Sequence, residues 1–481
     1  MISSIAAAIT LVTNQSATNL PRSAPEAQGI SSAGISRLID ELEKNDHLHS
    51  IMIVRHGKVV AEGWWSPYKS DQPHMLYSLS KSFTSTAIGM LIAEGKISLD
   101  DPIQKFFPED VPANPTSNQK EMRIRDLLCM STGHHPDVVD KMQYAGEVPL
   151  VKQFLNAPVE HKPGTLFYYN TPATFMLSAV VQKVTGEKLV DYLKPRLFDP
   201  LGIGYPMWET SPQGINMGGF GLNVITEDIA KFGQLYLQRG EWNGQRLLPA
   251  AWVDLATSKQ ASNGSNPYSD WDQGYGYQFW RCRPGFYRGD GAFGQYCIVM
   301  PQYDTVVAIT SGTGDMGGVM NTLWERLLPE LRATALPRNE LEESALATKM
   351  KGLVLPTING AAGASIASSL NGKVIDLAKN NTSLSKLSVT ASATSTTVQL
   401  EDIKFAIKPG AWVEAGKLAG NNISVSGAWT STDTLTLKVA QTNTPYVTTM
   451  TLKFAGSSFT GSAKVNVSFG GTAPVELKPK N

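Results

Sequence analysis

The chain has 481 residues, and its 42 Lys plus Arg balance its 42 Asp plus Glu, so the formal net charge is zero. A balanced charge gives no electrostatic reason to expect nucleic acid or an anionic membrane surface as a partner. Single cores stop growing at roughly 250–300 residues, so the length predicts one large domain and a smaller one.

The start of the chain gives no clear targeting signal. Residues 1–24 are predicted to be a disordered start or a degenerate leader, because the apolar run Ile5–Val12 has no Lys or Arg before Arg22. Localisation therefore stays open between export and the cytoplasm. No run of about 18 apolar residues occurs, so we expect no membrane span.

Residues 25–336 are predicted to form the large domain. Apolar spacing predicts a helix over Ser31–Leu42, and two β-rich runs around His56–Lys58 then predict a hairpin. Ser80–Glu94 has the clearest helical pattern in the chain. Residues 100–250 are mostly helical in pattern, and strands return at Ala292–Met300 and Thr305–Thr310. This order predicts an α+β fold (an α/β three-layer arrangement) with an antiparallel sheet flanked by helices and a mostly helical subdomain.

The composition changes after Pro337. Residues 337–351 are predicted to form a linker helix, and 352–481 a small all-β domain, because runs such as Asp433–Val439 alternate between polar and apolar residues. This segment contains neither His nor Cys. We therefore expect no chemistry there and interpret it as a packing module or a lid. The sequence does not predict the oligomeric state.

Metals, cofactors and disulfides have little support. The three cysteines, Cys129, Cys282 and Cys297, are too few for a disulfide framework and occur in no CxxC pair, although pairing of Cys282 with Cys297 stays open. His134-His135 lacks the spacing of a zinc motif. We expect no metal and no cofactor.

The first candidate for catalysis is Ser78-Leu79-Ser80-Lys81. A serine hydroxyl is a weak nucleophile that needs an adjacent base, and a lysine three residues later on a helix lies over the same face. Burial lowers the pKa of a lysine, and the neutral amine can then accept the serine proton. Taken alone, the motif also fits a helix N-cap at Ser78.

Two further motifs follow in order. Tyr168-Tyr169-Asn170 lies between a Pro-Gly turn and a predicted helix, where a tyrosine can transfer protons and an asparagine can orient a lysine. Gly289-Asp290-Gly291-Ala292-Phe293-Gly294 matches GxGxxG. These glycines lead into a strand rather than a helix, so we reject a dinucleotide site and expect a substrate to lie against an edge strand here.

Together, the order SxxK, YxN and a Gly-rich strand motif resembles the serine β-lactamases of the class C type, the penicillin-binding DD-peptidases and their esterase and amidase relatives. Flanking segments such as Leu127–Gly133 and Pro163–Pro172 agree, and they also resemble the 6-aminohexanoate-dimer hydrolases. The resemblance covers roughly residues 25–335 and implies a β-lactamase/DD-peptidase-like fold for them.

The resemblance implies a role for each matched residue. Ser78 would be the nucleophile, Lys81 its base, Tyr168 the second proton-transfer group and Asn170 a contact of lysine and substrate. The oxyanion hole would be the backbone N–H groups of Ser78 and Ala292. Gly289, Asp290 and Gly291 would form the substrate-binding strand.

The third motif departs from the family pattern. The β-lactamases and DD-peptidases have Lys-Thr-Gly or His-Thr-Gly where this chain has Gly289-Asp290-Gly291, and Arg288 should point to the face opposite Gly289. Because Asp290 would repel a carboxylate, small neutral esters or amides are the expected substrates. A β-lactamase or DD-carboxypeptidase activity is the alternative, and a non-catalytic binding or sensor protein on the same fold is the second alternative.

Overall fold

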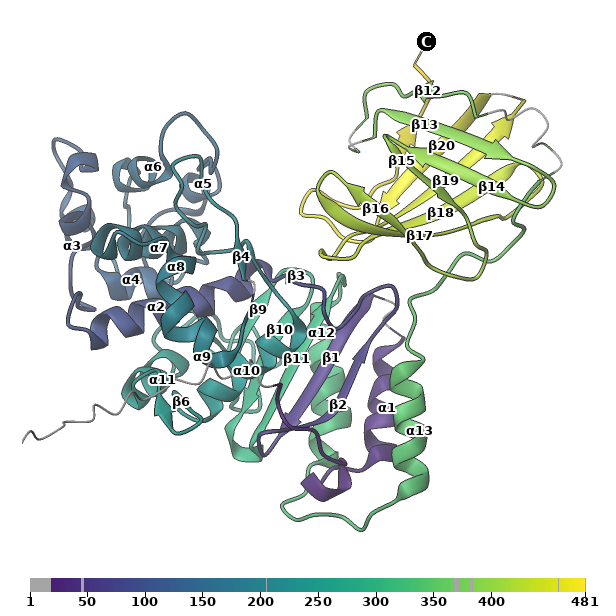
Figure 1. Ribbon diagram of the computed structural model, residues 1–481. Helices are drawn as coiled ribbons and strands as arrows, with labels where there is room; N and C mark the ends of the chain where they lie inside the picture. Colours follow the sequence, from purple (N-terminus) through teal and green to yellow (C-terminus); the bar gives the residue numbers. More distant parts are fainter. Residues whose placement is uncertain are drawn as a thin grey trace, which may run out of the picture.

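The computed structural model describes residues 19–480 except 45–46, 205, 365, 367–371, 381, 383 and 457. The predicted start at 1–24 therefore falls largely outside the described residues. Figure 1 shows three regions: a group of helices, a central sheet with helices beside it, and a separate β-rich region at the end of the chain.

The central sheet has six strands in the order β2-β1-β11-β10-β9-β8. All neighbouring strands are antiparallel. The hairpin predicted near His56 is confirmed, because β1 and β2 pair directly and the turn residues His56 and Gly57 have positive φ. The strands are β1 (Leu48–Arg55), β2 (Lys58–Trp64), β8 (Trp280–Arg281), β9 (Tyr287–Gly291), β10 (Gln295–Met300) and β11 (Thr305–Ser311).

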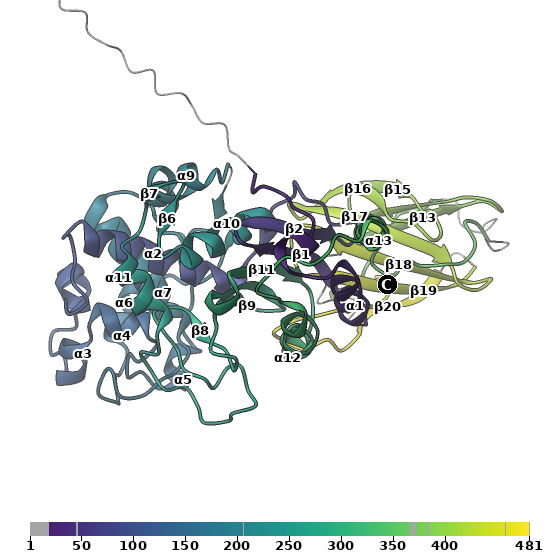
Figure 2. The ribbon, with the colours of Figure 1, turned by 90° about the horizontal axis from the view of Figure 1, so that it is seen from below.

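Helices cover both faces of this sheet, which gives the predicted three-layer arrangement. On one face α10 packs against β1, β10 and β11, and its core continues into the helical region. On the other face α1 and α13 lie side by side, and α12 follows β11 (Figures 1 and 2). The bounds are α1 (Ser32–Leu42), α10 (Thr226–Leu237), α12 (Met316–Thr322) and α13 (Glu340–Lys351).

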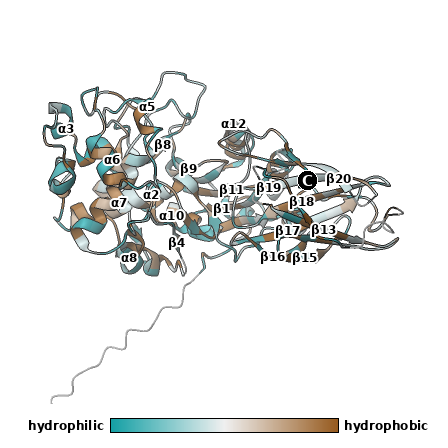
Figure 3. Cartoon of the chain, turned by 90° about the horizontal axis from the view of Figure 1, so that it is seen from above, coloured by the Kyte–Doolittle hydropathy of each residue, from teal (hydrophilic) through white to brown (hydrophobic). Residues whose placement is uncertain are grey.

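The helical region is built around α2 and α7, which pack against each other. In Figure 3 the outer α3 is hydrophilic, whereas α6 carries hydrophobic residues, which it buries against α7. Its helices are α2 (Ser80–Ala93), α3 (Ser117–Glu121), α4 (Ile124–Leu128), α5 (Pro136–Val139), α6 (Leu150–Asn156), α7 (Thr171–Thr185), α8 (Leu189–Leu193), α9 (Asp199–Leu201) and α11 (Ala250–Thr257). Short strands here are β3 (His74–Met75), β4 (Met207–Trp208), β5 (Leu222–Val224), β6 (Glu241–Trp242) and β7 (Gln245–Arg246).

The C-terminal region is all-β, as predicted. It consists of a four-stranded sheet, β12-β13-β14-β15, and a six-stranded sheet, β16 to β21 in chain order, with one hydrophobic core that draws on both. The strands are β12 (Ile375–Asp376), β13 (Lys386–Ala391), β14 (Thr396–Leu400), β15 (Ile403–Ala406), β16 (Val413–Leu418), β17 (Asn421–Trp429), β18 (Thr434–Gln441), β19 (Val447–Ala455), β20 (Ser458–Val465) and β21 (Val475–Leu477). The domain limits at 336 and 351 remain a prediction.

The C-terminal region is packed onto the rest of the chain rather than tethered loosely. The backbone N–H of Met75 donates to the carbonyl of Asn443 at 2.9 Å, and the Tyr68 hydroxyl donates to the carbonyl of Thr444 at 3.1 Å. Ala440 and Val447 belong to the same buried cluster as α1 and β1. The contacts reach β3, which leads directly to the SxxK motif.

Two sequence expectations concern cysteines and membranes. Cys129, Cys282 and Cys297 are buried and free, so Cys282 and Cys297 do not pair in this structure. Cys282 lies in the core on the α1 side of the sheet and Cys297 in the core on the α10 side. Within the described ranges, no helix is both long and apolar enough to cross a membrane.

Candidate active site

Ser78 lies in a single 3-10 turn, Tyr77–Leu79, that leads into α2. The turn begins with Tyr77 in the left-handed region at φ 46°, a conformation that costs a non-glycine residue free energy and is frequent at functional sites. Ser78 is half-buried at the wall of a cavity. The fold therefore holds this hydroxyl at the N-terminal end of a buried helix, as the sequence predicted.

Lys81 lies one turn further along and is 1% exposed. Its Nζ is 3.0 Å from Oγ of Ser78, 3.1 Å from Oγ1 of Thr171 and 2.8 Å from the carbonyl oxygen of Gly219. Burial lowers the pKa of Lys81 to about 7, although the charge of Asp290 opposes the shift. Near pH 7 a substantial fraction of this amine is therefore neutral.

The structure brings Tyr169 to the lysine instead of Tyr168. The Lys81 Nζ lies 4.9 Å from the centre of the Tyr169 ring, and that ring stacks on Trp280 with the centroids 5.4 Å apart. The pKa of Tyr169 is raised, chiefly by desolvation and further by Asp290, and an interaction with the Ser78 side chain lowers it. The Tyr168 hydroxyl instead donates to the carboxylate of Asp140 at 3.1 Å, in an exposed position.

Asn170 is likewise displaced from the role that the sequence suggested. Its Oδ1 accepts the backbone N–H of Ala173 at 3.0 Å and so caps α7, and its Nδ2 donates to Oγ1 of Thr132 at 3.0 Å. The contact with Lys81 comes from Thr171. The polar pair at the lysine is thus Tyr169 and Thr171, one residue later than the YxN match but with the same i, i+2 spacing, which was visible in the sequence.

The glycines of the third motif face α2 rather than the cavity. A Cβ atom on Gly289 would lie 2.4 Å from Cδ1 of Leu79 and 2.6 Å from Oγ of Ser82, and one on Gly291 would lie 2.0 Å from the carbonyl oxygen of Leu76. Glycine is needed here because the helix start approaches β9 so closely. Of the three residues predicted to bind substrate, Asp290 alone is among those that line the cavity.

Asp290 forms a buried ion pair with Arg288. Side chains two apart on a strand share a face, and Oδ2 of Asp290 accepts from Nε of Arg288 at 2.9 Å and lies 2.8 Å from its Nη2. The indole N–H of Trp271 donates to the same oxygen at 3.1 Å. Burial raises the pKa of Asp290, and Arg288 opposes that rise. Arg288 is therefore paired with Asp290, fully buried and not among the residues that line the cavity.

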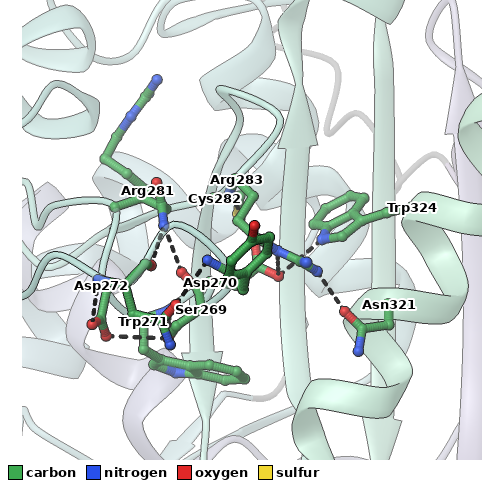
Figure 4. Close-up of polar contacts among 12 residues, drawn as sticks. Ser269, Asp270, Trp271, Asp272, Arg281, Cys282, Arg283, Asn321 and Trp324 are labelled. Atoms are coloured by element: carbon green, nitrogen blue, oxygen red, sulfur yellow. Dashed lines mark hydrogen bonds and ion pairs between the residues drawn. The ribbon is translucent and has the colours of Figure 1, made fainter.

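The loop that carries Trp271 is fixed by its neighbour Asp270 (Figure 4). The Asp270 carboxylate accepts the backbone N–H of Arg283 at 2.8 Å, the Arg283 Nε–H at 2.9 Å and the indole N–H of Trp324 at 3.0 Å. These contacts tie the loop to the turn that follows β8 and to the helical turn after α12. They hold Trp271 in the cavity wall beside Asp290.

The cavity that contains Ser78 has a volume of about 1050 Å³, enough for a small organic molecule. Ala292 also lines it, in the turn between β9 and β10. Within the described parts of the chain, no group of three or more His, Cys, Asp or Glu side chains is placed to hold a metal ion. The wall residues are Tyr77, Ser78, Val139, Asp140, Met142, Tyr144, Tyr169, Thr171, Pro172, Phe220, Trp271, Trp280, Asp290, Ala292, Met316 and Phe469.

Comparison with known proteins agrees with this fold. Residues 35–328 match the β-lactamase family. A 6-aminohexanoate-dimer hydrolase of Paenarthrobacter ureafaciens is 25% identical over 288 residues, which cover 55% of this chain and 73% of the relative. Penicillin-binding protein 4 of Amycolatopsis lactamdurans is 24% identical over 300 residues, which cover 54% of this chain and 77% of the relative.

The fold comparison extends beyond the hydrolase part. The structure of an octameric penicillin-binding protein homologue from Pyrococcus abyssi covers 93% of this chain and 99% of its own, with a TM-score of 0.50 and 16% identity. The protein is thus a serine hydrolase with a penicillin-binding-protein-like fold and an all-β C-terminal region. It belongs to the β-lactamase family.

Proposed function

We propose that this protein hydrolyses small neutral esters or amides through an acyl-enzyme on Ser78, with Lys81 as base and Tyr169 as the second proton-transfer group. The observation that carries the proposal is the 3.0 Å contact between Nζ of Lys81 and Oγ of Ser78, in a setting where burial lowers the pKa of Lys81 to about 7. A neutral amine at this distance is a competent general base.

The other two contacts of Lys81 support this role. A neutral amine has two protons and one lone pair. If the protons are donated to the carbonyl of Gly219 and to Oγ1 of Thr171, the lone pair is left for the hydroxyl proton of Ser78. Thr171 therefore acts as a positioning residue that orients the amine.

The reaction then has two steps. Oγ of Ser78 bonds to the substrate carbonyl carbon as its proton passes to Nζ of Lys81, and the carbon–leaving-group bond breaks as the leaving oxygen or nitrogen receives a proton through the Tyr169 hydroxyl. Water attacks the ester formed on Ser78 in the second step. Its proton is taken by the same groups, the acid is released and the serine hydroxyl is restored.

The backbone N–H groups of Ser78 and Ala292 form the oxyanion hole in this proposal. Both residues line the same cavity, Ser78 in the 3-10 turn that leads into α2 and Ala292 immediately after β9. A helix N-terminus also favours negative charge at this point. The closeness of the helix start to β9, which Gly289 and Gly291 permit, supports the pairing of these two donors.

The preference for neutral substrates rests on Asp290. Its carboxylate lines the cavity where the β-lactamases and DD-peptidases have a threonine between a cation and a glycine, and it forms an ion pair with Arg288. A substrate carboxylate would meet a like charge. The name of the Paenarthrobacter relative, a hydrolase of a 6-aminohexanoate dimer, also supports a small-molecule substrate.

The test is intact-mass spectrometry after reaction with a fluorophosphonate, run beside hydrolysis of p-nitrophenyl acetate. One adduct on the parent, none on Ser78→Ala, and ester turnover lost with it are expected. Ser80→Ala is the matched control from the same motif. The Ser80 hydroxyl accepts the backbone N–H of Leu222 instead of contacting Lys81, so this variant should still be labelled. Equal labelling of parent and Ser78→Ala would overturn the proposal, and turnover confined to a β-lactam would favour the alternative activity.

A further inference from the structure

The C-terminal domain contributes a side chain to the wall of the active-site cavity. Phe469, in the loop between β20 and β21, lines the cavity together with Ser78 and Ala292, although nearly 400 residues of sequence separate it from the nucleophile. It is 75% exposed, whereas the core of its own domain is buried. The domain does not need this ring for its own packing.

The loop is fixed to the hydrolase part at its first residue. Nδ2 of Asn466 donates to the carbonyl of Gly312, just after β11, at 2.8 Å and to the carbonyl of Pro445 at 2.9 Å. Oδ1 of the same side chain accepts the backbone N–H of Val447 at 2.8 Å. One amide therefore joins two loops of the C-terminal domain to the end of a sheet strand, three residues before Phe469.

The aromatic ring is placed next to the oxyanion side of the site. Its centroid lies 4.8 Å from that of Phe293, which follows Ala292, and 5.7 Å from that of Tyr77, which precedes Ser78, with the second pair edge-to-face. Tyr446, from the loop between β18 and β19, contacts Phe293 as well, and its hydroxyl bonds that of Tyr77. Two loops of the C-terminal domain thus meet both residues that flank the proposed N–H donors.

We propose that Phe469 is a specificity-determining residue, and that with Tyr77 it forms an aromatic subsite for an apolar, ring-bearing acyl group, with the Phe293 ring packed against both. This inference rests on the proposed function of Ser78 and adds the substrate class. The acyl side is chosen because, within the described part of the chain, the rings that contact Phe469 are those of Tyr77 and Phe293 beside the proposed oxyanion donors. The leaving group must lie on the other side, near Lys81 and Tyr169. Aromatic rings in contact are stabilised beyond the effect of area burial, and an exposed ring gains most when a ligand covers it.

The inference changes the role of the C-terminal domain. It is not only a packing module, because the substrate site is incomplete without its loop. The hydrolase part supplies the reacting groups, and the C-terminal domain supplies the apolar surface that selects the acyl group.

The kinetic test compares p-nitrophenyl phenylacetate with p-nitrophenyl acetate on the full chain. Phe469→Ala should lower kcat/KM for the phenylacetate about tenfold and change that for the acetate less than about twofold. Phe469→Leu should lie between, and Tyr268→Ala, which removes an aromatic ring that is 83% exposed outside the cavity, should change neither. A loss that is equal for both esters, or no loss for either, would overturn the inference.

The binding test separates this inference from the proposed function. In a Ser78→Ala background, which cannot form the acyl-enzyme, adding Phe469→Ala should raise the Kd for p-nitrophenyl phenylacetate about tenfold in a tryptophan-fluorescence titration. Weaker binding together with a parent that hydrolyses neither ester would leave the aromatic subsite standing and refute the proposed hydrolysis. If the parent hydrolyses the esters and Phe469→Ala changes neither binding nor selectivity, the proposed hydrolysis stands and the aromatic subsite is refuted.

Discussion

The amine nitrogen of Lys81 lies 4.9 Å from the centre of the Tyr169 ring, while the adjacent Tyr168 donates its hydroxyl to Asp140 at the surface. The two tyrosines are neighbours in sequence and leave the backbone in different directions. A motif search that counts from Asn170 selects Tyr168, whereas the fold places Tyr169 beside the lysine. The distinction can be tested because the two side chains are chemically identical.

We expect Tyr169→Phe to lower kcat by about 10²–10⁴-fold, the usual contribution of one positioned proton-transfer group. Tyr168→Phe is the matched control and should stay within about twofold of the parent, because the Tyr168 hydroxyl bonds the carboxylate of Asp140 and not Ser78 or Lys81. Steady-state hydrolysis of p-nitrophenyl acetate measures both. If Tyr168→Phe carries the larger loss, the proton route proposed here is wrong.

The low pKa of Lys81 predicts a specific pH dependence. Burial brings this pKa to about 7, and only the neutral amine can accept the Ser78 proton, so kcat/KM should fall about tenfold per pH unit below 7 and level off above it. The rate of fluorophosphonate labelling should follow the same curve. Lys81→Arg, which stays protonated, should abolish both reactions.

A rate that is flat from pH 5.5 to 8 would show that Lys81 is not the titrating base. If kcat/KM instead keeps rising with pH to above pH 9, the amine of Lys81 keeps the ordinary lysine pKa despite its burial. Either profile can be read from the parent enzyme alone, provided that circular dichroism shows it folded over the same range.

Asn170 and Thr171 are expected to separate stability from activity. Asn170→Ala removes the N-cap of α7 and should cost about 0.5–2 kcal/mol of stability, seen as a lower urea midpoint, with the Lys81 contacts intact. Thr171→Val keeps the shape but removes a hydroxyl from Nζ of Lys81, so kcat/KM should fall about tenfold or more with a smaller change in midpoint. The reverse pattern would restore the motif-based role of Asn170.

Much of the fold followed from local sequence rules. The hairpin of β1 and β2 was predictable because two β-rich runs flank a His-Gly turn, and the helix α2 because a continuous helical segment is closed by Gly95. Ser78 and Lys81 were predictable because three residues along a helix is a fixed geometry. These relations depend on chain neighbours alone.

What the sequence could not give depends on tertiary contacts. The direction of Tyr169 is set by packing against Trp280, more than 100 residues later. The ion pair of Arg288 with Asp290 follows from strand alternation. The hydrogen bond from the Trp271 indole to Asp290 instead depends on a loop that Asp270 holds in place. Phe469 reaches the cavity only because two domains dock, and no pattern within residues 352–481 signals that contact.

Gly289 gives the sharpest test of the strand geometry. From sequence alone, a lysine at this position would be expected to recreate the cation of the family's third motif and to improve acidic substrates. In the structure a Cβ atom there would lie within 2.4–2.6 Å of Leu79 and Ser82, beneath α2 and away from the cavity. We therefore expect Gly289→Lys to lose activity on all esters and to lower the urea midpoint, because overpacking a core site typically costs about 1–3 kcal/mol.

The comparison uses p-nitrophenyl propionate and the mono-p-nitrophenyl ester of succinic acid, which differ by one carboxylate. Gly289→Ala adds only the Cβ atom, so it should show part of the same loss and serves as the control for side-chain length. A folded Gly289→Lys enzyme that hydrolyses the acidic ester faster than the parent does would mean that this face of β9 borders the substrate. Equal losses on both esters, smaller for Gly289→Ala than for Gly289→Lys, would support the structural role of this glycine. In that role it allows the start of α2 to approach β9, which brings Ser78 and Ala292 to one cavity.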